Sequence, residues 1–138
     1  MPNDIYFGFD FGFSRIGMAV GQRLTCTASP LPTVSAVQGV PDWDAIQREV
    51  SQWHPDGFIV GFPTCIDGKA LYTSKASRRF AADLEARFSI PTCLVDERLT
   101  TVEARAHLFA KGGYKRIKKA AVDSIAACII LEQWLQGG

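Results

Sequence analysis

The sequence opens with an apolar strand that ends in one carboxylate, and this pattern constrains the fold more than any other stretch. Residues 5–12 read I-Y-F-G-F-D-F-G. With the period of two that a strand imposes, Ile5 and the three phenylalanines share one face, whereas Asp10 lies on the other face between Gly8 and Gly12. Glycine neighbours leave room for a ligand beside the acid. From these residues alone, Asp10 is either a capping residue of a turn or a site residue.

Short apolar segments further along the chain predict four more strands. They comprise residues 16–21, 24–29, 58–62 and 92–95. The first two continue the opening strand as an antiparallel meander, and Pro30 and Pro32 are expected to end that part of the sheet. The last two are continuous apolar runs, which are typical of strands buried on both faces.

Helices are expected between and after the later strands, because apolar residues recur there at helical spacing. The expected helices span residues 43–53, 100–112 and 122–134, and a further helix follows the polar segment 64–69. The apolar residues of that helix recur at four-residue intervals at Ala76, Phe80, Leu84 and Phe88. Asp42 is a plausible N-cap of the first helix, and Thr100 with Glu103 has the spacing of a capping box. Strands joined through helices lie parallel. The predicted fold is therefore α/β, with a mixed five-stranded sheet (antiparallel strands 1–3, parallel strands 4–5) flanked by helices.

The composition is that of one folded domain covering residues 1–138. Hydrophobic residues make up 47% of the chain and charged residues 21%, which argues against disorder. No apolar run approaches the roughly 20 residues of a membrane span. The four cysteines include no CxxC pair, so neither a zinc site nor a disulfide framework is indicated. We expect a soluble cytoplasmic protein with reduced thiols and no membrane partner.

Three acidic positions follow predicted strands or open a helix. Asp10 ends the first strand, Asp96 and Glu97 end the last one, and Asp123 lies in the first turns of the final helix. Ligands bind at the carboxyl ends of parallel strands, so these acids are candidates for one site. Carboxylates beside a phosphate bind magnesium or manganese, and two such ions hydrolyse phosphodiesters. Alternatively, the later acids only favour the dipoles of nearby helices.

A basic segment precedes the last acid. Residues 111–119 read K-G-G-Y-K-R-I-K-K, with five basic residues, one tyrosine and no acid. Such a segment is either a solvated connection or a surface that holds the phosphates of a polyanion, with Tyr114 stacking on a base. The net charge of +1 does not conflict with the second interpretation, because the local patch decides binding. Arg15, Lys69, Arg78, Arg79 and Arg98 are candidates to extend it.

Four motifs, spread over the chain in order, resemble those of the YqgF-type family, also called RuvX-like. They read D-F-G-F-S-R-I-G-M-A-V-G, I-V-G-F-P, D-E-R-L-T-T-V-E-A-R and G-G-Y-K-R-I-K-K-A-A-V-D-S-I-A-A-C-I-I-L-E. The resemblance covers essentially the whole chain. It implies a ribonuclease H-like fold related to the RuvC resolvases. It also implies a nuclease that matures the 5′ end of pre-16S ribosomal RNA, with Holliday junction resolution as the alternative.

The resemblance also implies the site residues. The catalytic and metal-binding acids would be Asp10, Glu97 and Asp123, with Asp96 as the alternative to Glu97, and the cofactor would be Mg²⁺ or Mn²⁺. The implied partners are pre-ribosomal RNA or branched DNA and ribosomal particles, and the chain would be a monomer or a weak homodimer. From the charge distribution described above, and not from the resemblance, the nucleic-acid-binding residues would be Arg15, Lys69, Arg98, Lys111, Tyr114, Lys115, Arg116, Lys118 and Lys119.

The turn after the first acid departs from the family pattern. Phe13 and Ser14 replace a threonine and a lysine, which removes two groups suited to contact phosphate near Asp10. A non-catalytic nucleic-acid-binding factor that keeps the fold is therefore a second hypothesis. Phosphate transfer from ATP is a third, since sugar kinases and actin-like ATPases share this topology. Those proteins need two such domains to enclose a nucleotide, whereas this chain has one.

Overall fold

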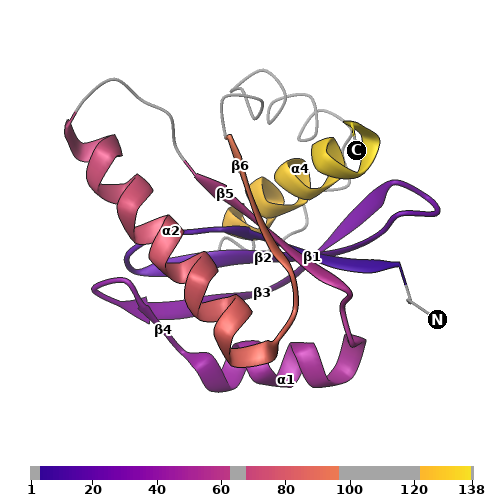
Figure 1. Cartoon of the computed structure of the whole chain (residues 1–138), viewed down its shortest axis with the longest axis horizontal. Helices are drawn as coiled ribbons and strands as arrows, with labels where there is room; N and C mark the ends of the chain where they lie inside the picture. Colours follow the sequence, from indigo (N-terminus) through magenta and orange to yellow (C-terminus); the bar gives the residue numbers. More distant parts are fainter. Residues whose placement is uncertain (1–3, 63–67, 97–121, 138) are drawn as a thin grey trace.

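The computed structural model describes residues 4–62, 68–96 and 122–137, which form one sheet with helices on both faces (Figure 1). The sheet is six-stranded, in the order β4-β3-β2-β1-β5-β6. Its strands are β1 (Ile5–Asp10), β2 (Arg15–Gln22), β3 (Thr27–Val37), β4 (Val40–Pro41), β5 (Gly57–Phe62) and β6 (Thr92–Asp96). The helices described are α1 (Trp43–Trp53), α2 (Gly68–Phe88) and α4 (Val122–Gly137).

The first strand occupies the middle of the sheet. β1 pairs antiparallel with β2 on one side and parallel with β5 on the other, and β5 pairs parallel with β6. The predicted mixed sheet, with an antiparallel meander continued by parallel strands, is therefore confirmed. The expected helix over 100–112 lies outside the described residues. Within the described residues, no helix is long and apolar enough to cross a membrane.

The end of the third strand was predicted wrongly, and the sheet has six strands instead of five. Leu24 lies in the turn before the strand and is 89% exposed, and β3 continues through Pro30 and Pro32 to Val37. The prolines are tolerated because β3 borders only β2 at Pro30 and Pro32. The other neighbour, β4, pairs only with Ala36 and Val37, the last two residues of β3. A proline lacks an N–H, and an edge strand does not need that N–H on its open side.

The α1 boundaries agree with the sequence prediction because both ends carry clear signals. The Asp42 side chain accepts a hydrogen bond from the Ala45 N–H, and His54 adopts the left-handed conformation that ends the helix. Ile46 and Val50 face the sheet and are buried. The helix α2 begins at Gly68, at the end of the polar segment 64–69 that is expected to lead into it.

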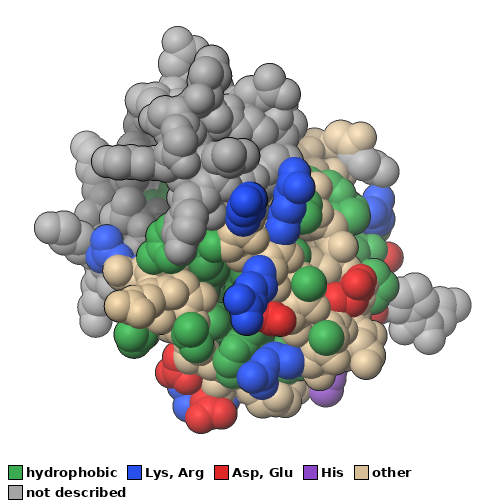
Figure 2. All heavy atoms as spheres, turned by 60° about the vertical axis from the view of Figure 1, so that its left-hand side comes forward, with side chains coloured by type: hydrophobic (Ala, Val, Ile, Leu, Met, Phe, Trp, Pro, Cys, Tyr) green, Lys and Arg blue, Asp and Glu red, His purple; other side chains and the backbone are tan. Residues whose placement is uncertain are grey.

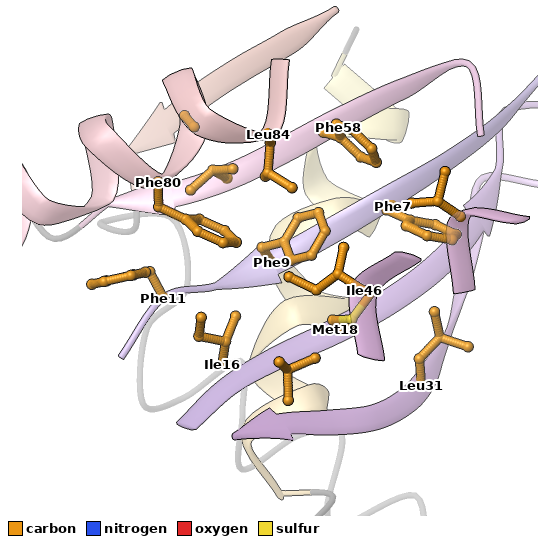
Figure 3. Close-up of a cluster of buried hydrophobic side chains, with 14 of the residues drawn as sticks. Phe7, Phe9, Phe11, Ile16, Met18, Leu31, Ile46, Phe58, Phe80 and Leu84 are labelled. Carbon is orange, nitrogen blue, oxygen red and sulfur yellow. The ribbon is translucent and has the colours of Figure 1, made fainter. Parts of the chain in front are cut away.

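The alternating side chains of β1 serve two different cores. Phe7 and Phe9 are fully buried against α1 and α2 (Figure 3). The centroid of the Phe9 ring lies 5.6 Å from that of Phe58 and 5.4 Å from that of Phe80. On the opposite face, Tyr6 packs on Trp134 of α4, with ring centroids 5.0 Å apart. The predicted division of β1 into an aromatic face and a glycine and acid face is therefore confirmed.

The helix α4 lies against β1 at a point where β1 has no side chain. A Cβ atom added at Gly8 would lie 2.7 Å from the Leu131 Cβ and 2.8 Å from the Ala127 carbonyl oxygen. Both neighbours belong to the body of α4, so neither can rotate away. The glycine therefore fixes how closely α4 approaches the sheet.

Replacing Gly8→Ala is expected to push α4 outward and lower the free energy of unfolding by about 1–3 kcal/mol, as for other overpacked cores. Urea unfolding followed by circular dichroism measures this. Gly137→Ala is the matched control, because a Cβ there meets nothing within 4 Å, and it should leave stability unchanged or slightly raised. Equal losses in the two variants would contradict the close approach at Gly8.

The thiol of Cys128 on α4 gives the core a dependence on alkaline pH. Burial, with a smaller contribution from the charge of Glu132, raises the pKa of Cys128 from 9.0 to about 12. Above pH 9 the unfolded chain ionises this thiol while the folded chain does not, so folding stability is lost as the pH rises from about 9 to 12. Near pH 10.5 the loss should reach up to about 2 kcal/mol. The urea midpoint of the parent should fall as the pH rises from about 9 to 12, whereas the midpoint of Cys128→Ala should lack this contribution to the fall. An equal fall in both proteins would contradict the raised pKa.

Candidate active site at the carboxyl end of the central strand

Asp10 is the last residue of the central strand, and its cross-strand neighbours have no side chains. It pairs with Gly17 in β2 and with Gly61 in β5. Gly8 and Gly12 are its neighbours on the same face of its own chain. Asp10 is half-buried and belongs to the face that α4 covers. The carboxylate thus stands in a row of glycines, so no side chain at these four positions lies directly beside it.

A β-bulge lies in the same row as Asp10. Between the pairs Ile16–Val34 and Met18–Leu31, Gly17 of β2 faces two residues of β3, Pro32 and Thr33. Such a bulge disrupts the ladder of hydrogen bonds and leaves backbone groups to be satisfied by other partners. Bulges of this kind are frequent beside active sites.

Ser124 of α4 supplies those partners. Its buried hydroxyl donates to the Leu31 carbonyl oxygen at 2.7 Å and accepts from the Met18 N–H at 3.2 Å. The Thr33 hydroxyl lies 3.2 Å away and donates, because the proton of Ser124 is already used. A serine hydroxyl has one donor and two acceptor sites, so its capacity is filled. The first turn of α4 is therefore fixed to the bulge.

This anchoring brings the start of α4 to the end of β1. Met18, which Ser124 binds, pairs with Phe9, the residue before Asp10. Asp123 is the residue before Ser124, in the first turn of α4. The rest of α4 then runs back along the sheet toward Tyr6, where Trp134 packs. The backbone positions of Asp10 and Asp123 are thus at the same edge of the sheet.

The last strand ends at that edge too. Asp96 is the final residue of β6 and pairs with Phe62, one position beyond the Gly61–Val95 pair. Val95 packs against the buried cluster that α4 forms with the sheet, on the same face of the sheet as Asp10. β6 lies two strands from β1, which corresponds to about 10 Å at the usual strand spacing. Glu97 lies outside the described residues.

The basic candidates are only partly described. Arg15 opens β2 and is exposed, close in the chain to Asp10, and Lys69 lies in the first turn of α2. Arg98 and the predicted basic residues between Lys111 and Lys119 lie outside the described residues. No cluster of three potential metal ligands occurs within residues 4–62, 68–96 and 122–137.

Sequence reasoning missed Ser124 and the glycines across from Asp10. A serine between Asp123 and Ile125 in an otherwise apolar helix is a signal for a buried hydrogen bond, but the sequence does not tell which backbone groups it satisfies. The glycines at 17 and 61 become neighbours of Asp10 only through strand register.

Comparison with known proteins now adds to this geometry. The family described as "RuvX: Holliday junction resolvase" matches residues 4–137. The chain belongs to the RuvX family. Among its relatives is the "Putative pre-16S rRNA nuclease" of Legionella pneumophila strain Philadelphia 1, which is 65% identical over 99% of this chain and 98% of its own length. The protein of the same name from Proteus mirabilis is 46% identical over 99% of this chain and 98% of its own length.

Solved structures of resolvases share the fold of this RuvX member. Thermus thermophilus RuvC in complex with a Holliday junction substrate superposes with a TM-score of 0.59 at 13% identity, covering 96% of this chain and 94% of RuvC. The fowlpox virus Holliday junction resolvase gives 0.57 at 12% identity, covering 97% and 99%. The predicted family and the ribonuclease H-like fold are confirmed, and the predicted enzyme class, a nuclease, agrees with the family.

Replacing Ser124→Ala removes the hydroxyl that satisfies two buried backbone groups, so the free energy of unfolding should fall by about 1–3 kcal/mol. The Met18 amide should also exchange its hydrogen faster, which NMR-detected hydrogen exchange measures. The control is Ser29→Ala, at an exposed serine in β3 with no role at the bulge. Unchanged protection of Met18 would contradict the anchoring.

Proposed function

We propose that this protein is a metal-dependent endonuclease that hydrolyses phosphodiester bonds in the 5′-end processing of pre-16S ribosomal RNA. The observation that carries the proposal is the meeting of three chain segments at one edge of the sheet: the end of β1 at Asp10, the end of β6, and the anchored start of α4 at Asp123. The similarity to relatives named as pre-16S rRNA nucleases supports the substrate class.

The metal ligands in this proposal are Asp10, Glu97 and Asp123, and the metal is Mg²⁺ or Mn²⁺. Carboxylate oxygens are the ligands that these ions prefer, and Asp10 offers one carboxylate among glycines at the end of the central strand. Between Asp96 and Glu97, the resemblance of the D-E-R motif to that of the family favours Glu97, which lies outside the described residues.

The chain's own residues have distinct roles in this mechanism. Bound ions would activate a water molecule and neutralise charge on the phosphate and the leaving oxygen. Asp10 holds its ligand position from a central strand, which is among the least mobile parts of a fold. Ser124 fixes the turn of α4 that carries Asp123, so it is a positioning residue. Arg15 and the basic segment of residues 111–119 hold the phosphates of the strand.

Replacing Asp10→Asn is expected to reduce metal-dependent cleavage of a precursor RNA to the level of the protein-free control, because an amide is a poor ligand for these ions. Unfolding midpoints should stay close to those of the parent. Asp44→Asn on α1 is the matched control and should cleave like the parent. Undiminished cleavage by Asp10→Asn would refute the proposed metal site.

A second candidate function is resolution of branched DNA, which the description of the family favours. The discriminating experiment offers a pre-16S leader RNA and a synthetic four-way junction side by side, with Mn²⁺ and with a chelator. RNA products with a defined 5′ end support the proposed processing role. Paired nicks in the junction support resolution, and they require two active sites. Salt-sensitive binding without any cleavage would instead support the non-catalytic factor.

A further inference from the structure

A pocket of about 450 Å³ opens on the face of the sheet opposite α4, between the middle of α2 and the hairpin of β3 and β4. The hairpin supplies residues 38–41 of its lining, and α2 supplies a wall that includes Lys75 and Arg79. The volume falls within the range of about 300–1,000 Å³ that is typical of ligand sites. The mechanism proposed for the acids at the edge of the sheet does not use this pocket.

The α2 wall of the pocket is a row of charges. Lys75, Arg79 and Asp83 line it at four-residue intervals, so successive members stand about 6 Å apart along the helix axis. All three side chains are exposed. Figure 2 shows Lys and Arg side chains following one another across the middle of the face turned toward the viewer, with hydrophobic side chains beside them. The wall thus offers two neighbouring cations and then one acid.

The cationic end of this row lies toward the edge of the sheet that carries Asp10. Phe80 of α2 packs on Phe11, the residue that follows Asp10, whereas Phe88 packs on Phe58 near the start of β5. The helix therefore runs away from that edge as the residue numbers rise. The two cations are thus nearer to the edge than the acid of the row is.

The two cations are available to an external anion. Arg87, further along α2, already lies over the ring of Trp43, 4.3 Å from its centre. By contrast, no ion pair or ring contact joins Lys75 or Arg79 to another residue within the described ranges 4–62, 68–96 and 122–137. Even Asp83, one helical turn beyond Arg79, makes no such pair there.

The hairpin wall opposite the row carries no charge. Residues 38–41 read Q-G-V-P, and Val40 among them is 63% exposed. Phe11 and Phe13 also line the pocket, but they pack on each other with ring centroids 5.7 Å apart, and no contact with a ligand is assigned to them. The charges of α2 are therefore the feature of the pocket that selects a ligand.

A row of two cations suits the backbone of a nucleic-acid strand. Phosphates recur along a strand at a spacing close to one step of the row, so neighbouring phosphates meet neighbouring cations. Such contacts position a strand without reading its sequence. The acid at the far end repels phosphate and marks where the contact ends.

An apolar protein segment is the competing occupant, because Val37 and Val40 are 75% and 63% exposed beside the pocket. Such a segment would remove water from Lys75 and Arg79 without supplying a counter-charge, and burial of an unpaired charge is costly. The charges on the wall therefore favour a polyanion.

We propose that Lys75 and Arg79 bind two successive phosphates of the substrate strand, at a distance from its contacts with the acids. This assignment rests on the proposed nuclease function for the identity of the strand. The strand would pass from Asp10 over the edge of the sheet at residues 11–13 and continue along α2. Contacts on both faces would hold the strand across the edge and limit its movement relative to the acids.

The first test measures binding of a labelled single-stranded RNA by fluorescence anisotropy in EDTA, so that cleavage plays no part. Lys75→Gln and Arg79→Gln should each reduce the slope of log K against log salt concentration by about 0.7, the value for one phosphate contact on a single strand. Their loss of affinity should therefore grow about fivefold for each tenfold reduction in salt. Arg48→Gln, at an exposed arginine of α1 that does not line the pocket, is the matched control and should keep the slope of the parent.

The acid of the row gives a test of opposite sign. Asp83→Asn removes a charge that repels phosphate, so it should strengthen RNA binding at low salt. Asp44→Asn, at an exposed acid of α1 outside the pocket, should bind like the parent. Unfolding midpoints of all variants verify that they are folded.

The length of the strand locates the contact. The RNA is shortened stepwise from its 5′ end and, in a second series, from its 3′ end. In one series the parent should lose its advantage over Arg79→Gln, because the phosphates that this arginine contacts are missing, and in the other series the advantage should persist. Equal advantages at every length in both series would overturn the contact.

The remaining outcomes separate this contact from the nuclease proposal. Asp10→Asn should keep the dependence of binding on Lys75 and Arg79, so the contact stands even if no RNA is cleaved. If the α2 variants bind and cleave RNA like the parent, the contact is overturned and the nuclease proposal stands. If the parent binds no RNA, or if inorganic phosphate displaces the strand at an equal concentration of phosphate groups, the strand assignment is overturned. If the variants change only the sedimentation of the protein, the pocket belongs to a protein interface, and the proposal is overturned.

Discussion

The position of α4 on the sheet depends on one buried hydroxyl and one missing side chain. Ser124 satisfies the backbone groups that the bulge between β2 and β3 leaves open, and Gly8 lets the helix backbone approach β1. The bulge lies in the row of Asp10, so the irregularity of the sheet, the helix anchor and the central acid form one local arrangement. A helix held only by apolar packing would slide more easily, because apolar contacts are not directional. Hydrogen bonds to a fixed backbone remove that freedom.

The central strand then divides the functions of the two faces. Its odd-numbered phenylalanines build the core with α1 and α2 and continue into the pocket at Phe11 and Phe13. Its even-numbered residues, Tyr6, Gly8 and Asp10, lie on the face of α4. A carboxylate on the aromatic face would be desolvated without a partner, at a cost of several kcal/mol. The period of two therefore places the acid and the phenylalanines next to each other in sequence but on opposite sides of the sheet.

Much of this arrangement could be predicted from the sequence, because it depends on local patterns. The alternation in residues 5–12 gave the two faces of β1, and the caps at Asp42 and His54 bounded α1. The extent of β3 could not be predicted, since proline is unfavourable in a strand unless the strand has an open edge, and strand order decides that. Ser124 was missed for a similar reason. Its partners are 93 and 106 residues away in the chain and become neighbours only through a bulge.

Phe13 shows what the structure adds to a departure from the family pattern that the sequence reveals. In the sequence it replaces a polar residue near Asp10, which suggests lost phosphate contacts. In the structure it packs on Phe11 and Gly39 and lines a pocket whose wall carries Lys75 and Arg79. A fully exposed phenylalanine would leave its apolar surface in water, whereas the half-buried Phe13 gains free energy from packing on Phe11. The replacement of a hydroxyl and an ammonium in this turn thus comes with packing that joins the turn to the connection between β3 and β4.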